Sequence, residues 1–345
     1  MSSMVLVFAG DLHAKHINPA SRTDDYNEAF FKKLGFIEDV LRKTEASALI
    51  VGGDVFNDVP STVPHSLVNR LIETFGAFPC PVAVSPGNHD MVYRKLSLMD
   101  ATPLGVLAKA HAVNLVTTTD VSEPLRVWSP EGDMEVEIHG RQYVQDEDLG
   151  FLKSVRYEKT DAVKVLSIHH NVDTHAGRHY NEPQFSYEQL SKGSGAPFDL
   201  VNVGHLHTDG GIQEVSDTVF MRLGALMRGS LRYEDINRVP AVAGVRVSWE
   251  PFKSCSQLRA YAGKTLYYKW SHIRLPVEPV SSVFDLEAYE QRKEEGKSMD
   301  KFIAELASTS VTSVDPLGML RELQMGPSIR STVIEYLGRA ERSLG

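Results

Sequence analysis

Val5-Leu-Val-Phe-Ala-Gly-Asp-Leu-His13 sets the pattern of the chain, because a short apolar run leads through a glycine into potential metal ligands. Such runs, short and mostly β-branched, predict buried strands. Four more segments repeat the order: Ala48–Val51 precedes Asp54, Val82–Val84 precedes Asn88, His89 and Asp90, Val163–Ile168 precedes His169 and His170, and Leu200–Val203 precedes His205 and His207.

Helical patterns lie between the first three of these predicted strands. One apolar helix face contains Phe30, Leu34, Ile37 and Leu41, and a second helix is expected around Leu71. Strands that alternate with helices predict an α/β sandwich in which both sheet faces are covered. Because ligands gather at the carboxyl ends of strands in such sheets, we expect the five polar clusters to converge.

The residue types in these clusters suit divalent cations. Carboxylate and amide oxygens combined with imidazoles match manganese, iron or zinc, with magnesium as a further alternative, and no thiolate is present. A carboxylate such as Asp54 can bridge two ions about 3.5–4 Å apart, which activate water and hold a phosphate between them. A neighbouring histidine can then protonate the leaving oxygen. The prediction is a site for two ions, with manganese preferred.

The motifs also resemble a known family. Asp-x-His, Gly-Asp, Gly-Asn-His-Asp, His and Gly-His-x-His, in this order, resemble the calcineurin-like metallophosphoesterases. Within that family, Gly-Asp-Leu-His, Gly-Gly-Asp-Val-Phe, Gly-Asn-His-Asp and Gly-His-Leu-His resemble the SbcD-type DNA-repair nucleases, over roughly residues 4–250. The resemblance implies a four-layer αββα sandwich with a small C-terminal capping subdomain and a helical tail.

The resemblance also implies residue roles. His89 would be the general acid or a phosphate contact, and Asp90 would orient it. His169 is preferred to His170 as a ligand because it directly follows its strand, with His170 as the alternative. One ion would be held by Asp11, His13, Asp54 and His207, and the other by Asp54, Asn88, His169 and His205. At Asn57 the chain departs from nuclease members that often carry a second histidine there.

Length and composition limit the class of protein. The chain has 345 residues, a net charge of −9 and only Cys80 and Cys255, which predicts no disulfide framework. Its apolar runs are too short for a membrane span, and Met1 to Gly10 does not resemble a secretory signal, so we expect a cytoplasmic protein. Broad coating with Lys and Arg for nucleic-acid binding is excluded, but a local basic surface is not.

Such a local surface is predicted between Ala241 and Val280, where six bases stand against two acids and aromatic residues are interleaved. The segment predicts either a capping subdomain that follows a phosphate backbone or end strands of the sandwich with the rings in the core. Three regions follow: a nuclease domain at 1–245, the capping subdomain at 246–282 and the helical tail at 283–345. The tail either covers the main domain or, by the resemblance, docks on an SbcC-type ABC ATPase. Whether the chain forms a homodimer stays open.

The preferred functional hypothesis is a manganese-dependent DNA exonuclease or endonuclease in DNA repair, recombination or processing. Candidate DNA contacts are Asn57, Arg178, Arg228 and Arg232. The alternatives are an enzyme for a small substrate, such as a cyclic-nucleotide phosphodiesterase or a phosphomonoesterase, and a non-catalytic scaffold on the same fold. The apparently complete ligand set argues against the scaffold.

Overall fold

A computed structural model describes residues 3–118, 123–150, 161–179, 182–230, 233–261, 264–287 and 290 of the chain. The chain divides into two compact units, Met1–Val280 and Ser281–Gly345. The architecture below is that of the first unit, except that α7 belongs, apart from Val280, to the second unit. The helical tail predicted at 283–345 lies almost entirely outside the described residues.

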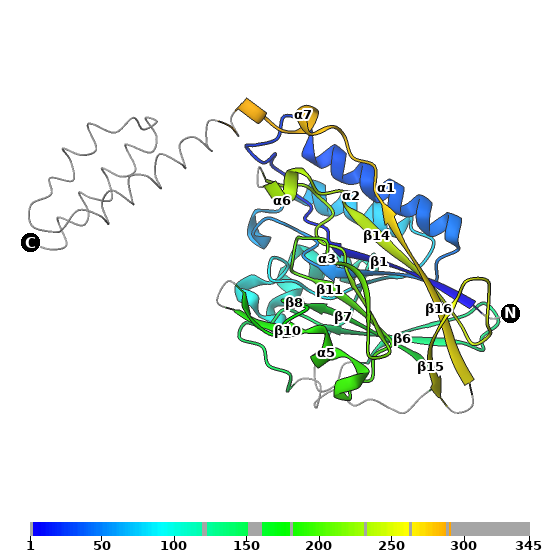
Figure 1. Cartoon of the computed structure of the whole chain (residues 1–345). Coiled ribbons are helices and arrows are strands. Elements are labelled where there is room, and N and C mark those ends of the chain that lie inside the picture. Colours follow the sequence, from blue (N-terminus) through cyan, green and yellow to red (C-terminus); the bar gives the residue numbers. More distant parts are fainter. Residues whose placement is uncertain are drawn as a thin grey trace, which may run out of the picture. The chain divides into compact units, whose positions relative to one another are not determined.

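The first sheet has seven strands in the order β15-β16-β14-β1-β2-β3-β4 (Figure 1). Its strands β1 to β4 run parallel, whereas β14 pairs antiparallel with β1 and continues into the antiparallel pair β16 and β15. The bounds are β1 Ser3–Asp11, β2 Ala48–Gly53, β3 Val82–Val84, β4 Asn114–Leu115, β14 Ala241–Ser248, β15 Ser256–Tyr261 and β16 Lys264–Arg274.

The second sheet has six strands in the order β12-β13-β11-β7-β6-β5. Its four central strands are parallel, and the edge strands β5 and β12 are antiparallel to their neighbours. The bounds are β5 Leu125–Trp128, β6 Glu135–Arg141, β7 Val163–His169, β11 Leu200–Gly204, β12 Gly211–Val215 and β13 Thr218–Arg222. A separate three-stranded sheet contains β8 Val172–Asp173, β10 Glu182–Ser186 and β9 Gly177–His179.

Helices cover the outer faces. The long helix α1 begins where the Asp25 side chain accepts a hydrogen bond from the Glu28 N–H, and it ends at Glu45, which has left-handed backbone. None of the helices among the described residues is long and apolar enough to span a membrane. The bounds are α1 Tyr26–Thr44, α2 His65–Gly76, α3 Pro103–Lys109, α5 Tyr187–Leu190, α6 Tyr233–Ile236 and α7 Val280–Val283; short 3₁₀ helices are η1 Pro60–Thr62, η2 Val92–Arg94, η3 Leu96–Ala101 and η4 Lys192–Ser194.

Alternation along the strands builds the layers. In β1, Val7 and Ala9 pack with α1 and α2, whereas Leu6 and Phe8 pack against the second sheet. On the far face of the second sheet, Val201 packs with residues of α5 and the small sheet. Helices, two large sheets and a further covering layer are therefore stacked as expected, and the four-layer sandwich is confirmed (Figure 1).

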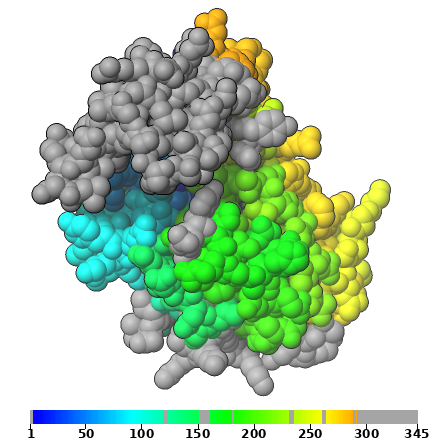
Figure 2. All heavy atoms as spheres, turned by 60° about the vertical axis from the view of Figure 1, so that its left-hand side comes forward, coloured from blue at the N-terminus to red at the C-terminus, as the bar shows by residue number. Residues whose placement is uncertain are grey.

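The basic and aromatic segment between Ala241 and Val280 extends the first sheet. Its strands β16 and β15 pair next to β14, and Tyr268 is buried between the two large sheets. Figure 2 shows β15 and β16, in yellow, at the right-hand edge of the molecule. The pairing favours the alternative in which this segment forms end strands of the sandwich, because no break in the sheet occurs at residue 246.

Candidate metal centre

The two large sheets approach each other closely at the carboxyl ends of β2 and β11. A Cβ on Gly204 would lie 2.1 Å from the carbonyl oxygen of Gly52, so only glycine permits this approach. Polar contacts also join the sheets here: Ser167 Oγ donates to the Val51 carbonyl at 3.1 Å, and Asn202 Nδ2 donates to the Ala9 carbonyl at 3.0 Å. The loops that follow both sets of strands therefore share one edge.

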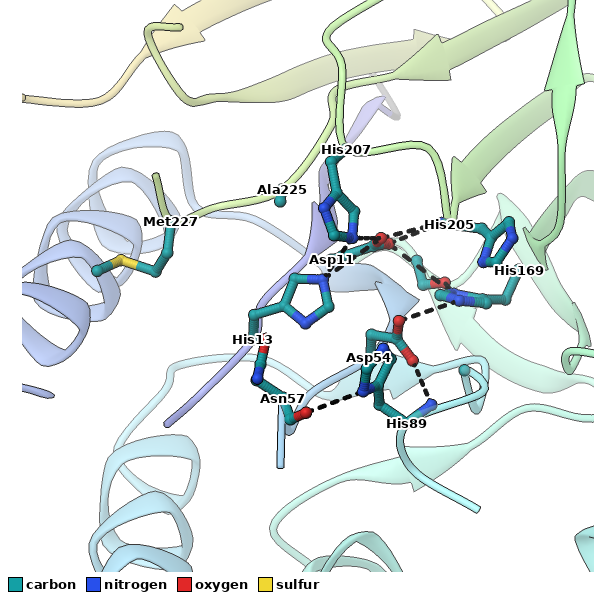
Figure 3. Close-up of polar contacts among 12 residues, drawn as sticks. Asp11, His13, Asp54, Asn57, His89, His169, His205, His207, Ala225 and Met227 are labelled. Atoms are coloured by element: carbon teal, nitrogen blue, oxygen red, sulfur yellow. Dashed lines mark hydrogen bonds and ion pairs between the residues drawn. The ribbon is translucent and has the colours of Figure 1, made fainter. Parts of the chain in front are cut away.

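Asp11, His13 and His207 form the first group of potential ligands at this edge (Figure 3). The Nε2 atoms of the two histidines are 2.8 Å apart, and each lies within 3.9 Å of Asp11 Oδ2. Asp11 and His13 are buried, whereas half of the His207 side chain is exposed. The first group is therefore open to solvent on the His207 side.

The second group gathers around His169. Its Nε2 atom lies 3.4 Å from Asp54 Oδ2 and 3.1 Å from Asn88 Oδ1. Asn88 Oδ1 is also 3.1 Å from Nδ1 of His205. Asp11 Oδ1 lies 3.8 Å from Nδ1 of His169, so this carboxylate adjoins both groups. The structure thus brings together all seven side chains that the sequence predicted as ligands.

Three of these residues have left-handed backbone, which is uncommon for non-glycine residues: His13 (φ 57°), Asp54 (φ 43°) and His205 (φ 84°). Hydrogen bonds between segments far apart in the sequence hold these residues. The His13 N–H donates to the Asp54 carbonyl at 2.8 Å, and the His205 N–H donates to Asp11 Oδ1 at 2.9 Å. Contacts within the fold itself therefore hold the backbone of these ligand residues in place.

Electrostatics within the cluster are dominated by burial and by the two carboxylates. Burial would raise the pKa of Asp54, but His169 outweighs it and lowers the pKa of this carboxyl. Burial would lower the pKa of His169, but Asp54 and Asp11 raise it to about 10. Burial lowers the pKa of His205 to about 3 and holds that of His13 well below its usual range. The Asp54 carboxylate is therefore charged and the imidazoles of His13 and His205 are neutral, as cation ligands must be. Asp54 and Asp11 favour a proton on His169, which an ion bound there would replace.

This donor set fits divalent cations. The imidazole nitrogens of His13 and His207 face each other, and Nδ1 of His13 is buried without a hydrogen-bond partner among the described residues. Mixed oxygen and imidazole donors without thiolate suit manganese, iron or zinc. Asp11 belongs to both candidate groups, whereas the family resemblance implies Asp54 as the shared ligand; both carboxylates are close enough to His169 to take that position.

His89 lies beside the first group, but its orientation differs from the expectation. Its Nδ1 atom is 2.8 Å from the carbonyl oxygen of Asn57, and its ring meets that of His13 edge to face at 5.5 Å. Asp90 accepts hydrogen bonds from the N–H groups of Gly87 and Phe56 and is buried. The orienting role predicted for Asp90 is therefore corrected: Asn57 holds the ring, and Asp90 holds the loop.

His170 points away from the two groups. Its Nδ1 atom accepts from the Asn171 N–H, and its Nε2 atom lies 3.3 Å from the Val144 carbonyl. Its ring stacks on Tyr143. The geometry therefore favours His169 as the ligand of this pair.

The four candidate DNA contacts lie in different surroundings. Arg228 is buried and donates to the carbonyls of Ile236 and Glu278, so its prediction as a DNA contact is wrong. Arg178 is exposed on β9, where it faces Asp146 at 4.0 Å. Arg232 lies outside the described residues. Asn57 is half-buried, and its side chain lies 3.4 Å from Asp58.

Sequence reasoning missed Glu182 and Tyr143. Glu182 Oε2 lies 3.2 Å from Nε2 of His205, and Tyr143 donates to Glu182 Oε1 at 2.6 Å. Neither residue belongs to a motif that follows a strand with potential ligands, so the pattern used to find the other residues could not find them.

The comparison with protein families agrees with this site. A family model described as calcineurin-like phosphoesterase matches residues 4–209. A search of the curated proteins gives no match. Solved structures similar to the chain include a putative 5'-nucleotidase from Staphylococcus aureus in complex with alpha-ketoglutarate, with 16% identity and a TM-score of 0.49, covering 85% of this chain and 58% of that chain.

Two further structures are similar. One is a 5'-nucleotidase precursor from Thermus thermophilus, with 14% identity and a TM-score of 0.44, covering 85% of this chain and 59% of that chain. The other is the calcineurin-like phosphoesterase YfkN from Bacillus subtilis, with 14% identity and a TM-score of 0.46, covering 84% of this chain and 97% of that chain. The chain thus spans less than two thirds of both nucleotidase structures.

Proposed function

Because the chain belongs to the calcineurin-like phosphoesterase family, we propose that it hydrolyses phosphodiesters with two divalent ions, manganese in the first place, and that its substrate is DNA. The observation that carries the proposal is the convergence of seven oxygen and nitrogen donors from both sheets on one edge (Figure 3). When bound, the ions supply an activated water and positive charge for the phosphate oxygens.

The protein's own residues would divide the work as follows. Asp11, His13 and His207 hold the first ion, and Asn88, His169 and His205 hold the second. Asp54 is the proposed shared ligand. Its Oδ1 atom accepts a hydrogen bond from the His89 N–H at 2.9 Å, which couples its position to the Gly-Asn-His-Asp loop.

His89 is the proposed general acid. Its Nδ1–H donates to the Asn57 carbonyl, which leaves Nε2 to hold a proton and release it to the leaving oxygen. The position of its ring beside His13 puts this proton next to the first group. Its backbone N–H donates to Asp54 at the same time, so the proposed general acid and the proposed shared ligand are directly hydrogen-bonded.

DNA as the substrate is supported by the likeness of Gly-Asp-Leu-His, Gly-Gly-Asp-Val-Phe, Gly-Asn-His-Asp and Gly-His-Leu-His to SbcD-type nucleases. The same likeness supports a cytoplasmic role in DNA repair or processing. It also supports docking of the tail on an SbcC-type ATPase, for which loss of pull-down after truncation beyond Phe284 is the test.

A small phosphoester is the second candidate, and a specific observation favours it. Arg246 and Lys269 pair beside Val5, six residues before Asp11. At about 3.3 Å per residue, that puts them roughly 20 Å from the ligand edge. Arg259 is paired with buried Asp199. Part of the basic segment is therefore remote from the metal centre or already neutralised.

A digestion assay with manganese distinguishes the candidates. End-labelled linear duplex, circular single-stranded DNA and bis-p-nitrophenyl phosphate are compared, with His89→Ala as the catalytic variant. His111→Asn is the matched control, because this exposed histidine has left-handed backbone that asparagine tolerates. Cleavage of both DNA and the small ester is expected. Cleavage of the small ester alone would reject DNA, and no metal-dependent cleavage of either would reject the proposed function.

A further inference from the structure

His205 is contacted at both ring nitrogens. Its Nδ1 atom faces Asn88 Oδ1 at 3.1 Å, on the side of the second group. Its Nε2 atom lies 3.2 Å from Oε2 of Glu182. This carboxylate oxygen is buried and makes no aligned hydrogen bond with any described residue, so the imidazole of His205 is the polar group that lies against it. A buried carboxylate oxygen without another partner is costly, so its position against an imidazole needs an explanation.

Glu182 is itself held from the other side. Tyr143 donates to its Oε1 atom at 2.6 Å, and Arg94 donates to the Tyr143 hydroxyl at 3.2 Å. Arg94 also donates to Gln145 at 3.1 Å. These bonds join the segment after β3, cyan in Figure 2, to the green segment after β6, and the two lie side by side on that surface. The chain of contacts therefore reaches from η2 to the second group.

The contact selects a tautomer. A carboxylate oxygen 3.2 Å from Nε2 favours the tautomer of His205 with its proton on Nε2, because only that proton can satisfy the oxygen. This tautomer leaves the lone pair on Nδ1, which faces the second group. His169 is treated in the opposite sense. Its Nδ1–H donates to the Gly52 carbonyl at 2.7 Å, so an ion that replaces the Nε2 proton would meet the lone pair on Nε2, next to Asp54 and Asn88. The two acceptors, Glu182 and the Gly52 carbonyl, thus leave Nδ1 of His205 and Nε2 of His169 facing the same atom, Asn88 Oδ1.

We propose that Glu182 is a positioning residue for His205 and that, supported by Tyr143, it sets the affinity of the second group for its divalent ion. The inference rests on the proposed function, since it assumes that this group holds a metal. Loss of such a partner typically lowers metal affinity by about 10- to 100-fold.

The test measures manganese(II) binding to the full chain by calorimetry and by electron paramagnetic resonance of the coupled ion pair. Glu182→Ala is expected to weaken the second ion by about 10- to 100-fold, while the first ion binds as in the wild type. Glu182→Gln keeps an oxygen acceptor and is expected to recover part of the loss. Tyr143→Phe, which frees Glu182, is expected to give a smaller loss.

Glu214 and Tyr268 offer matched controls, because the Tyr268 hydroxyl donates to Glu214 in the same kind of pair. Glu214→Ala and Tyr268→Phe should bind both ions as the wild type does. Unchanged binding in Glu182→Ala would overturn the inference. So would an equal loss of both ions with a lower melting temperature of the metal-free protein, which indicates a structural role only. Failure of the wild type to bind a second ion would instead reject the proposed two-ion function, and the inference with it.

Discussion

Gly204→Ala tests whether the close approach of the two sheets builds the metal centre. The added Cβ would lie 2.1 Å from the Gly52 carbonyl oxygen and 2.7 Å from Asp11 Oδ1, both far inside van der Waals contact. The neighbours are backbone atoms and a buried ligand, so no flexible side chain can move aside. The strands β2 and β11 must therefore separate locally by roughly 1 Å.

Two costs add. Overpacking of this kind costs about 1–3 kcal/mol. Displacement of the Gly52 carbonyl also lengthens its 2.7 Å hydrogen bond with Nδ1 of His169, whose loss costs about 1 kcal/mol. The free energy of unfolding is expected to fall by about 2–4 kcal/mol. Because Asp11 and His169 both shift, manganese affinity should fall as well.

Urea denaturation of the metal-free protein measures the first effect and calorimetric titration with manganese the second. Gly35→Ala is the control, because a Cβ at this exposed position in α1 meets no atom within 4 Å. It should be neutral or stabilise by up to about 1 kcal/mol. A Gly204→Ala variant as stable as the wild type, with unchanged manganese affinity, would refute the reasoning.

Three further predictions concern single side chains. His89→Ala should lower kcat for bis-p-nitrophenyl phosphate by about 10²- to 10⁴-fold with unchanged metal content; full activity would remove it as the general acid. Arg228→Ala removes the donor of two carbonyl hydrogen bonds and should lower the free energy of unfolding by about 1–3 kcal/mol. Arg178 is exposed, so Arg178→Ala should change it by less than about 0.5 kcal/mol. Urea denaturation in which both variants match the wild type would contradict this prediction. Burial lowers the pKa of His139 from 6.5 to about 4, so the unfolded chain binds the extra proton between these values and stability is lost as pH falls from about 6.5 to 4. His139→Gln should flatten that part of the pH profile of metal-free protein, and an identical slope would contradict the assignment.

The strands and the convergence of the candidate ligands could be predicted because their signals are local. Val5–Ala9 is a mostly buried apolar run, and the glycines before Asp11 and His205 lie at the ends of the strands that candidate ligands follow. Parallel pairing then forces the carboxyl ends of such strands to one edge. No long-range information was needed to expect Asp11 and Asp54 together.

Other features depend on contacts that no local pattern records. Arg228 resembled a surface base, but it is buried and donates to the carbonyls of Ile236, 8 residues away, and Glu278, 50 residues away. The rings between Ala241 and Val280, among them Trp249 and Tyr268, also allowed a nucleic-acid interpretation, because interleaved bases and rings are equally typical of sheet strands with one buried face. Glu182 lies beside His205 only because the fold brings β10 to this histidine, a contact that no local pattern predicts.

Anomalous diffraction from crystals soaked in manganese tests the central claim most directly. Two peaks about 3.5–4 Å apart are predicted. One should lie between Asp11, His13 and His207, and the other between Asn88, His169 and His205, with Asp54 in contact with both. A single peak, or peaks away from these side chains, would contradict a two-ion centre at this edge of the sheets.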